Sequence, residues 1–472
     1  MINVKSKETE QRLREIFSDR LLMDVSDLVS YGFDASFGQY MPDYVVQVLS
    51  TEDVQNVVKL ADEYIIPIYA RGASTSLSGG ALPVKGGIVV DFSQWNDEFE
   101  IYPDDLIIKT RPGVITGKIH ALAEKHNLMY PPDPSSSVVC TIGGNLAENA
   151  GGPRGIKYGV TKDYVIGLEV VMPDGEVIRT GGQTIKNVTG YDLTKLLIGS
   201  EGTLGIITEA TLRLIPKPLA TKTAMVIFDD LYTAGKSISK ILTSGVRPSK
   251  MEILDHNALN KVEDYAGLDL PRDAAAILLI EVDGNPENLG DELDTIQKAL
   301  KEIDVENVEI AESKEAEDKL WQVRKLVSPA VVESGYTKIS EDATVPLSKI
   351  PEMFKKIDEI KTKYDLNIVV FGHAGDGNLH PTINTNMRDE NEVRKTEDAV
   401  EEIFNYAIEL GGTLSGEHGI GVMKKAFIKK EMGEAGVRYQ QMIKKALDPK
   451  NILNPGKIFP EKGEERLVLR NE

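Results

Sequence analysis

Two short motifs in the second half of this 472-residue chain hold three of its six histidines. His373 and His380 stand at the two ends of a stretch that contains Gly375 and Gly377, and the apolar run Ile368–Phe371 predicts a strand leading into it. A glycine-permitted turn would bring the two imidazoles together. Two neutral imidazoles and one carboxylate suit Zn²⁺ or another late divalent metal, with a position left open for substrate.

The second motif places a carboxylate beside a histidine, in Ser415-Gly416-Glu417-His418-Gly419. On an extended backbone neighbouring side chains point to opposite sides, so a metal bound by Glu417 would leave His418 facing another group. We therefore predict separate roles for these two residues. Asp376 competes with Glu417 as a metal ligand, but its place in a turn predicts that it holds the loop through an Asx-type hydrogen bond.

A glycine-rich loop, Arg71–Gly80, follows a predicted strand and contains three glycines and four hydroxyl-bearing side chains. Small side chains allow backbone N–H groups to converge on an anion, the hydroxyls add donors, and Arg71 adds positive charge. The loop therefore fits a pyrophosphate cradle, with an ordinary surface loop as the alternative. It matches neither GxGxxG nor GxxxxGK[ST], so neither nicotinamide nor ATP is the natural inference.

Two further segments are rich in glycine. The first is made of three short runs, Pro131–Ser135, Thr141–Asn145 and Asn149–Gly152. Glycine pairs permit close backbone approach, and the amides of Asn145 and Asn149 suit hydrogen bonds along the edge of a flat ligand. Tight turns are the alternative interpretation. The second, Gly199–Ile206, brings glycines and backbone donors to the entry of a strand.

The segments follow one another as RGASTSLSGG, PPDPSS with TIGGNLAENAGG, and GSEGTLGIITEATL. In this order they resemble the FAD domain of the vanillyl-alcohol-oxidase type flavoproteins, over about residues 40–460. The resemblance is strongest to the branch with glycolate oxidase catalytic subunits and the FAD-linked D-lactate and D-2-hydroxyglutarate dehydrogenases. It implies that the first segment holds the FAD pyrophosphate, and that the other two line the isoalloxazine ring and ribityl chain.

The resemblance assigns cofactor contacts to residues of all three segments and to one residue near the C-terminus. They are Arg71, Gly72, Ala73, Ser74, Thr75, Ser76, Gly79, Gly80, Pro132, Asp133, Thr141, Gly144, Asn145, Asn149, Gly151, Gly152, Glu201, Gly205, Ile206 and Asn454. Relatives with covalently bound flavin often carry a histidine in the first loop. This loop has none, so the resemblance implies noncovalent FAD.

The histidine motifs are similar to the family's GHxGDGNLH and EHG motifs. By this resemblance His373, His380 and Glu417 are ligands of a divalent metal, Zn²⁺ or Fe²⁺. His418 then matches the catalytic base.

Substrate contacts follow from the same resemblance. Arg324 matches the family's arginine on a helix of the substrate domain, where a guanidinium would clamp a carboxylate, and a solvated helix arginine is the alternative. Ser328 and Lys338 are candidates for further polar contacts with substrate.

The implied reaction is metal-assisted oxidation of a small D-2-hydroxy acid, D-lactate or glycolate, to the 2-oxo acid. Hydride would pass to flavin N5, and electrons would leave to an external acceptor or a partner redox subunit. The alternatives are a D-2-hydroxyglutarate dehydrogenase and a noncatalytic flavin-binding subunit of a redox complex. A relative of alkyl-dihydroxyacetone-phosphate synthases would need basic residues that the acidic composition does not supply.

The elements that must position these residues fall into two halves. Val45–Leu49 predicts a strand, and Thr51 predicts the cap of a helix whose apolar positions from Val54 to Ala61 follow helical spacing. Pro173-Asp174-Gly175 predicts the turn of a hairpin. After the break at Pro216-Lys217-Pro218, longer strands alternate with charged helices.

We predict an α+β protein with two domains. The resemblance implies a two-subdomain FAD-binding domain of the vanillyl-alcohol-oxidase (PCMH) type at residues 1–218. An α+β substrate domain with an antiparallel sheet and the metal site would follow at residues 219–423. Residues 424–472 would return to the FAD domain.

Composition limits the partners. The 74 acidic and 54 basic side chains give a formal charge of -20, so nucleic acid and anionic lipid surfaces are not expected as partners. The single cysteine, Cys140, excludes an internal disulfide and an iron–sulfur cluster held by this chain. The N-terminal residues predict an amphipathic helix, and no apolar run approaches the length of a membrane span. We therefore expect a cytoplasmic protein, and a homodimer remains open.

Overall fold

The computed structural model describes residues 7–464 and 466–469. The chain divides into two compact units. Unit 1 takes in the described residues up to 150, residues 160–217, and those from 417 onwards, whereas unit 2 comprises 151–159 and 218–416. The predicted division is 1–218, 219–423 and 424–472, and its residues 1–6, 465 and 470–472 lie outside the described part. The units differ from this division in three ways: residues 151–159 pack within unit 2, Pro218 also belongs to unit 2, and the return to unit 1 begins at Glu417.

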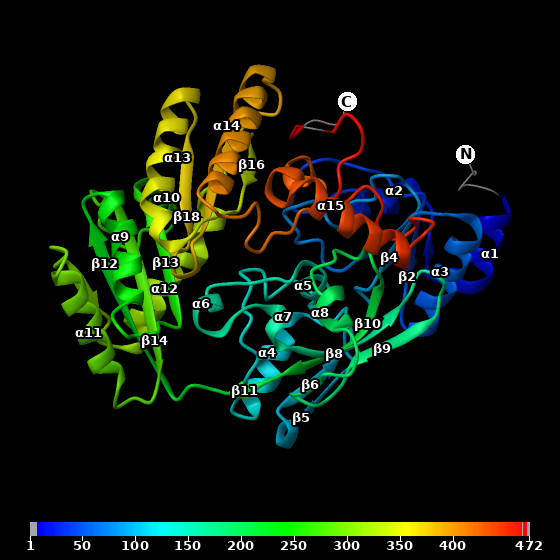
Figure 1. The fold of residues 1–472 in the computed structure, drawn as a ribbon, viewed down its shortest axis with the longest axis horizontal. Helices are drawn as coiled ribbons and strands as arrows, with labels where there is room; N and C mark the ends of the chain where they lie inside the picture. Colours follow the sequence, from blue (N-terminus) through cyan, green and yellow to red (C-terminus); the bar gives the residue numbers. More distant parts are fainter. Residues whose placement is uncertain (1–6, 465, 470–472) are drawn as a thin grey trace. The chain divides into compact units, whose positions relative to one another are not determined.

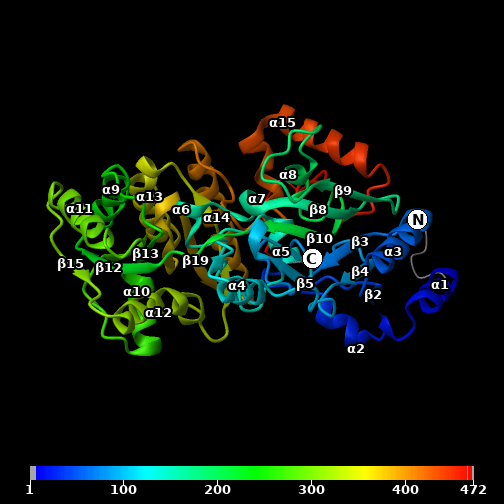
Figure 2. The ribbon, with the colours of Figure 1, turned by 90° about the horizontal axis from the view of Figure 1, so that it is seen from below.

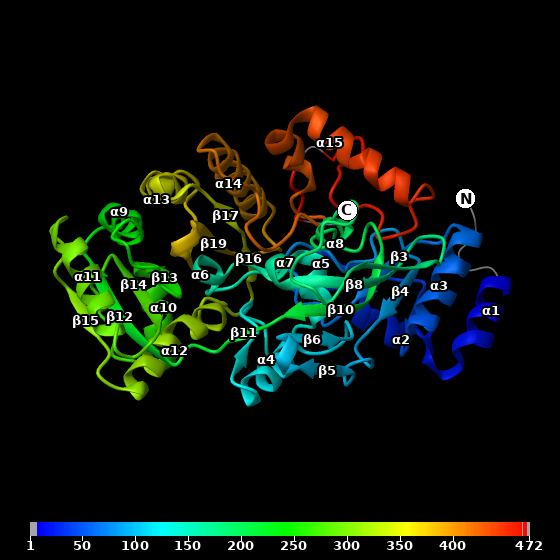
Figure 3. The ribbon, with the colours of Figure 1, turned by 60° about the horizontal axis from the view of Figure 1, so that its bottom comes forward.

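Unit 1 contains a four-stranded and a five-stranded sheet, with the strand orders β1-β2-β4-β3 and β5-β6-β10-β8-β9. In the first sheet β2, β3 and β4 are parallel, and in the second all pairings are antiparallel, as Figure 3 lets the reader follow for β8, β10, β6 and β5. The elements of unit 1 are α1 (Lys7–Phe17), β1 (Leu21–Leu22), α2 (Val25–Leu28), β2 (Tyr44–Gln47), α3 (Thr51–Tyr64), β3 (Ile68–Arg71), β4 (Ile88–Asp91), β5 (Phe99–Tyr102), β6 (Ile107–Thr110), α4 (Thr116–Lys125), β7 (Leu128–Met129), α5 (Ile142–Glu148), α7 (Thr161–Tyr164), β8 (Val165–Val171), β9 (Val177–Gly181), α8 (Leu193–Leu197), β10 (Ile206–Arg213), β11 (Ile215–Pro216) and α15 (Ile428–Leu447) (Figure 1).

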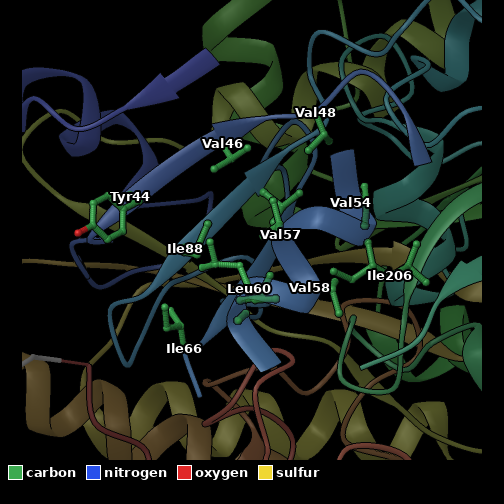
Figure 4. Packing of buried hydrophobic residues seen from close by; sticks show 14 of the residues in the cluster. Tyr44, Val46, Val48, Val54, Val57, Val58, Leu60, Ile66, Ile88 and Ile206 are labelled. Carbon is green, nitrogen blue, oxygen red and sulfur yellow. The ribbon is translucent and has the colours of Figure 1, made fainter. Parts of the chain in front are cut away.

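The core of the parallel sheet is formed by the apolar face of α3. Val54 and Val57 of this helix are buried in one cluster with Val46 of β2 and Ile88 of β4 (Figure 4). Side chains at these spacings share one face of a helix, so the periodicity in the sequence places them against the sheet. The α3 helix crosses over between two parallel strands and thereby sets the direction of β3, which ends at the glycine-rich loop.

The predicted cap of α3 is wrong by one residue. Ser50 is the N-cap, because its hydroxyl accepts a hydrogen bond from the Asp53 N–H, whereas Thr51 is the first helical residue. The Thr51 hydroxyl instead donates to Glu169 Oε1 at 2.7 Å. Both side chains are competent caps, so a contact with a distant strand decided between them.

The predicted hairpin of unit 1 is confirmed. Strands β8 and β9 pair in antiparallel register through a turn at residues 172–176, where Gly175 adopts a φ of +81°. The hairpin lies beside β10, the strand that follows the third glycine-rich segment.

Unit 2 is built on one eight-stranded antiparallel sheet with the order β15-β12-β14-β13-β18-β19-β16, in which β17 also pairs with β19. Figure 2 shows α9, α11 and α13 on one face of this sheet and α10 and α12 on the other. The elements of unit 2 are α6 (Gly155–Tyr158), β12 (Ala220–Phe228), α9 (Leu231–Leu242), β13 (Lys250–Asp255), α10 (His256–Ala266), β14 (Ala276–Gly284), α11 (Leu289–Lys301), β15 (Val308–Ile310), α12 (Lys314–Ala330), β16 (Thr337–Ser340), β17 (Ala343–Thr344), α13 (Ile350–Tyr364), β18 (Ile368–His373), β19 (Asn378–Thr385) and α14 (Glu390–Glu409).

Alternation along the strands decides which residues face α10 and α12. Leu254, Ile277, Leu279 and Phe371 are buried in one cluster with Trp321 of α12. Residues two apart on a strand share a face, so His373 lies on the same side of the sheet as Phe371.

Of the helices in the described part of the chain, none is both long and apolar enough to cross a bilayer.

Candidate active site

The hairpin β18–β19 brings the first two predicted metal ligands together. His380 pairs directly with Phe371 in the ladder, so His373 and His380 are diagonal neighbours on one face. Their ring centroids lie 5.2 Å apart with perpendicular planes, and both side chains are buried. The predicted convergence of the two imidazoles is confirmed.

The turn between the strands depends on Gly377, which adopts a φ of +81°. A Cβ at this position would lie 2.2 Å from the Val345 carbonyl oxygen, so only glycine fits. Asp376 Oδ1 accepts a hydrogen bond from the Asn378 N–H at 3.3 Å, which confirms the predicted Asx-type contact.

A buried carboxylate that the sequence analysis did not single out joins His373 to Arg324. Glu252 of β13 is 0% exposed; its Oε1 lies 2.6 Å from His373 Nδ1, and its Oε2 accepts from Arg324 Nε. Burial by itself raises the pKa of Glu252, but the charges of His373 and Arg324 outweigh it and hold that pKa below its ordinary value. Arg324 also lies over the Phe371 ring at 5.2 Å, and its burial rules out the solvated-arginine alternative.

The two further substrate candidates lie next to each other. Lys338 of β16 donates to the Ser328 hydroxyl at 2.9 Å, one helical turn beyond Arg324 on α12. Burial lowers the pKa of Lys338 from its ordinary value. Arg324, Ser328 and Lys338 thus supply hydrogen-bond donors along one side of α12.

Glu417 and His418 lie in a bend, because the chain turns at residues 416–418 instead of continuing as a strand. The backbone of Glu417 and His418 is therefore not extended as predicted, and their separate roles stay a prediction. Gly416, the last residue of unit 2, packs against Thr344 and Asn378, and Glu417 opens the returning part of unit 1.

Unit 1 contains a pocket lined by all three glycine-rich segments, including residues of β3, α5 and β10. Of the predicted cofactor residues, those that line it are Arg71, Gly72, Thr141, Gly144, Gly205 and Ile206. Further lining comes from Phe92, Pro112 and Ala147. The mixture of apolar walls with backbone donors suits a cofactor.

Charged groups surround the first and third segments. Burial, reinforced by the charge of Glu201, raises the pKa of Glu148 well above its ordinary value. Burial also raises the pKa of Glu201, although backbone N–H donors oppose it. Burial lowers the pKa of the Lys457 ammonium to about 7, against the attraction of Glu201, Asp34 and Glu148. These groups are in unit 1.

Known proteins resemble the whole chain. A family model described as "FAD linked oxidases, C-terminal domain" matches residues 217–458, and one described as "FAD binding domain" matches residues 42–181. The chain is 45% identical to the glycolate oxidase subunit GlcD of Bacillus subtilis, with 93% of each chain covered. It is 34% identical to the D-lactate dehydrogenase of Anaerostipes hadrus, with 97% of this chain and 98% of that protein covered. This chain belongs to the FAD-linked oxidases.

Solved structures share the fold of this FAD-linked oxidase at low sequence identity. A p-cresol methylhydroxylase matches with a TM-score of 0.78 and 18% identity, covering 96% of each chain. The 4-ethylphenol oxidase from Gulosibacter chungangensis matches with a TM-score of 0.77 and 19% identity, covering 97% of this chain and 98% of that one. The predicted α+β fold with a PCMH-type FAD-binding domain and the predicted FAD-linked oxidoreductase class are both confirmed.

The first glycine-rich loop of this oxidase fits FAD in its backbone and hydroxyls. Ser74 Oγ is buried without a hydrogen-bond partner among the described residues, as expected of a donor reserved for a ligand. A Cβ at Gly72 would lie 2.1 Å from Thr141 Oγ1, so glycine lets the first and second segments meet. The Arg71 guanidinium donates to the carbonyls of Ser30, Tyr31 and Phe33, and therefore fixes the base of the loop.

The three asparagines predicted to contact the cofactor have protein partners in this oxidase. Asn145 Nδ2 donates to Thr116 Oγ1, and Asn149 Oδ1 accepts from the Lys162 N–H. Asn454 Nδ2 donates to the carbonyls of Gly80 and Glu201, and so ties the first segment to the third. Asn454 Oδ1 also accepts from Lys457 Nζ at 3.1 Å, so any side-chain contact with the cofactor is left to the other amide atoms of Asn145 and Asn149.

The other predicted cofactor residues occupy loops of the two units. Ala73, Thr75, Ser76, Gly79 and Gly80 lie in the first loop, Pro132 and Asp133 lie before α5, and Gly151 and Gly152 open the segment that packs in unit 2. This segment is fixed by Lys157 and Tyr158, which both donate to the Asp283 carboxylate.

Sequence reasoning missed Glu252, Glu148 and Lys457 as parts of the site. Glu148 lies in the motif TIGGNLAENAGG, and Lys457 lies in Asn454-Pro455-Gly456-Lys457, so a charge within a glycine-containing motif was the available signal. Glu252 lies in a strand without such a motif.

Proposed function

We propose that this oxidase converts a small D-2-hydroxy acid, glycolate or D-lactate, to the 2-oxo acid. The relatives named for glycolate oxidase and D-lactate dehydrogenase cover nearly the whole chain. The observation that carries the proposal is the buried array of His373, His380, Glu252 and Arg324 on one face of the unit 2 sheet. Such an array offers a cation for a carboxylate next to ligands for a metal.

The chain's own residues fit a divalent metal, Zn²⁺ or Fe²⁺. A histidine whose Nδ1 is held by a carboxylate binds metal through Nε2, which is the arrangement that Glu252 gives to His373. His380 Nδ1 lies 3.4 Å from the Glu341 carbonyl oxygen. When bound, the metal would act as a Lewis acid toward the substrate hydroxyl.

Chain connectivity supports Glu417 as the third ligand. Ser415 Oγ donates to Asp342 Oδ2 at 2.7 Å, and a carboxylate oxygen of Asp342 lies within 4.8 Å of a ring nitrogen of His380. Two peptide units separate Ser415 from Glu417, so their Cα atoms lie within about 8 Å of each other. This connection along the chain supports Glu417 as the third ligand of the proposed metal site.

Each remaining residue has one task in this proposal. Arg324 binds the substrate carboxylate through N–H groups other than the Nε that Glu252 holds. His418 accepts the proton of the substrate hydroxyl at a ring nitrogen. When bound, FAD would supply the electron acceptor for the hydride of the α-carbon. Ser328 and Lys338 contact the rest of the substrate.

Electrons leave to an external acceptor or a partner redox subunit. The GlcD relatives are named as subunits, which supports a partner for this chain. The single cysteine gives this chain no cluster of its own.

The substrate class is tested by anaerobic titration of the purified flavoprotein with glycolate, D-lactate, L-lactate and D-2-hydroxyglutarate. We expect glycolate or D-lactate to bleach the oxidised flavin band, and L-lactate to leave it unchanged. An oxidised spectrum with all four acids would contradict the proposal and favour a noncatalytic subunit. Bleaching by D-2-hydroxyglutarate alone would select that acid instead.

Noncovalent FAD is expected at about one per chain. The first loop, residues 71–80, contains no histidine. Its backbone N–H groups and its hydroxyls, such as the buried Ser74 Oγ, are available as hydrogen-bond donors. Acid denaturation should therefore release the flavin into the supernatant, where its absorbance is compared with the protein concentration. Flavin that stays with the precipitated protein would contradict this prediction.

A further inference from the structure

We propose that Glu201 is a positioning residue for His418. Its carboxylate fixes the backbone that follows His418 and thereby sets the direction of the imidazole. This inference rests on the proposed function, which assigns His418 as the base. The cofactor contact predicted for Glu201 stays a prediction.

Both carboxylate oxygens of Glu201 accept hydrogen bonds from this segment. One oxygen accepts from the Ile420 N–H at 2.8 Å, and the other accepts from the Gly421 N–H at 2.7 Å. Glu201 is only 6% exposed, so little water competes for these bonds. Hydrogen bonds to an ionised acceptor are about twice as strong as neutral ones.

The backbone of Glu201 is itself held in place. The residue adopts a φ of +52°, its N–H donates to the Ala147 carbonyl at 2.9 Å, and its carbonyl accepts from Asn454 Nδ2 at 2.5 Å. A side chain on so constrained a backbone can act as a fixed anchor.

The segment that Glu201 holds is otherwise prone to move, because glycines stand at 419 and 421 with φ values of +83° and +50°. A Cβ at Gly419 would lie 2.1 Å from Glu148 Oε2 and 3.2 Å from Glu201 Oε1, so the chain passes against both carboxyl groups. Beyond it, the N–H groups of Val422 and Met423 donate to the Ser78 carbonyl. His418 therefore precedes a stretch that is anchored at four successive residues.

Charge identifies Glu201, and not Glu148, as the ionised anchor. Glu201 accepts two N–H bonds, whereas Glu148 accepts only the Ser76 hydroxyl at Oε1, and its buried Oε2 has no partner among the described residues. Two carboxylates this close do not both ionise readily. The proton belongs on Glu148, whose pKa is raised by burial and by the charge of Glu201.

The consequence for the reaction is geometric. Without the anchor, the two glycines permit the 418–421 backbone to rotate, and the imidazole moves away from the hydroxyl proton. A displacement of about 1 Å at a reacting group can cost about 100-fold in rate. Glu201→Gln keeps the size of the side chain but presents an NH₂ group to one of the two backbone N–H donors.

The experiment is a double-variant cycle with the FAD-loaded enzyme, measured as the limiting rate of anaerobic flavin reduction by the better of glycolate and D-lactate. We expect Glu201→Gln to lower this rate about 10- to 100-fold with an unchanged substrate dissociation constant. In a His418→Ala background the same change should have no further effect, because Glu201 acts through His418. Glu209→Gln, a half-buried carboxylate on β10 paired with Arg111 and Arg179, is the matched control and should stay within about twofold.

Hydrogen exchange gives a readout that does not depend on activity. The peptide 417–423 should exchange faster in Glu201→Gln than in the parent enzyme or Glu209→Gln. If Glu201→Gln does not fold with FAD, Glu201→Asp, which keeps the charge but is one methylene shorter, takes its place with the same expectations.

The outcomes separate the two proposals. The positioning role would be overturned if Glu201→Gln lowered the rate of flavin reduction by the same factor in the presence and absence of His418. It would also be overturned if hydrogen exchange of the 417–423 peptide were unchanged. Normal flavin reduction in His418→Ala alone would instead overturn the assignment of the base, while the exchange result would still report on the anchor.

Discussion

Replacing His418 by alanine is expected to lower the rate of flavin reduction by about 10²- to 10⁴-fold, the usual contribution of a positioned general base. FAD should stay bound, because its cavity is lined by the glycine-rich segments and their neighbours in unit 1. A 2-hydroxy acid should also still bind, since Arg324 and the two unit 2 histidines proposed as metal ligands are unchanged.

Stopped-flow reduction under anaerobic conditions measures this effect directly, with FAD content from absorbance and metal content from elemental analysis. His126→Ala, a change at an exposed histidine beyond the end of α4, is the matched control and should reduce normally. Normal reduction in His418→Ala would refute its role as base. Loss of metal from that variant would mean that Glu417 and His418 have exchanged roles.

Replacing His380 by alanine is expected to abolish turnover together with metal binding. A site with one imidazole and one carboxylate holds a divalent metal poorly, and the substrate hydroxyl then has no Lewis acid beside it. FAD content should remain at the level of the parent enzyme, because His380 belongs to unit 2 and the cavity to unit 1. Glu252→Gln should weaken metal binding by about 10- to 100-fold, the usual effect of losing a carboxylate behind a metal-bound histidine.

Elemental analysis and flavin absorbance on the same samples separate metal loss from cofactor loss. Chelator treatment of the parent enzyme should reproduce the His380→Ala behaviour, and added Zn²⁺ or Fe²⁺ should restore activity to the parent but not to the variant. The claim fails if active parent enzyme contains no stoichiometric transition metal. It also fails if His380→Ala retains both its metal and its turnover.

Much of the fold and part of the site could be read from local patterns. The convergence of His373 and His380 follows from a strand, a glycine turn and the two-residue period of a ladder, all within a few residues of one another. The α3 helix and the hairpin β8–β9 follow in the same way from helical spacing and turn chemistry. The order of the glycine-rich segments likewise indicated the FAD domain, which the family models confirm.

Other predictions failed where several local solutions were equally good. Ser50 and Thr51 are both competent caps, and the contact of Thr51 with Glu169, 118 residues away, decided between them. The extended backbone assumed for Glu417 and His418 is a bend, because glycines on both sides allow either conformation.

The sequence by itself determined which residues are proposed to carry the chemistry, since their types and short spacings are typical of ligands, donors and turns. Only the tertiary structure decided how these residues are held. Glu252 lies 72 residues from Arg324 and 121 from His373, and Glu201 lies 219 residues from Ile420, whose N–H it accepts. No local pattern specifies such pairs, because a buried carboxylate is placed by the pairing of strands and the packing of loops that are distant in the chain.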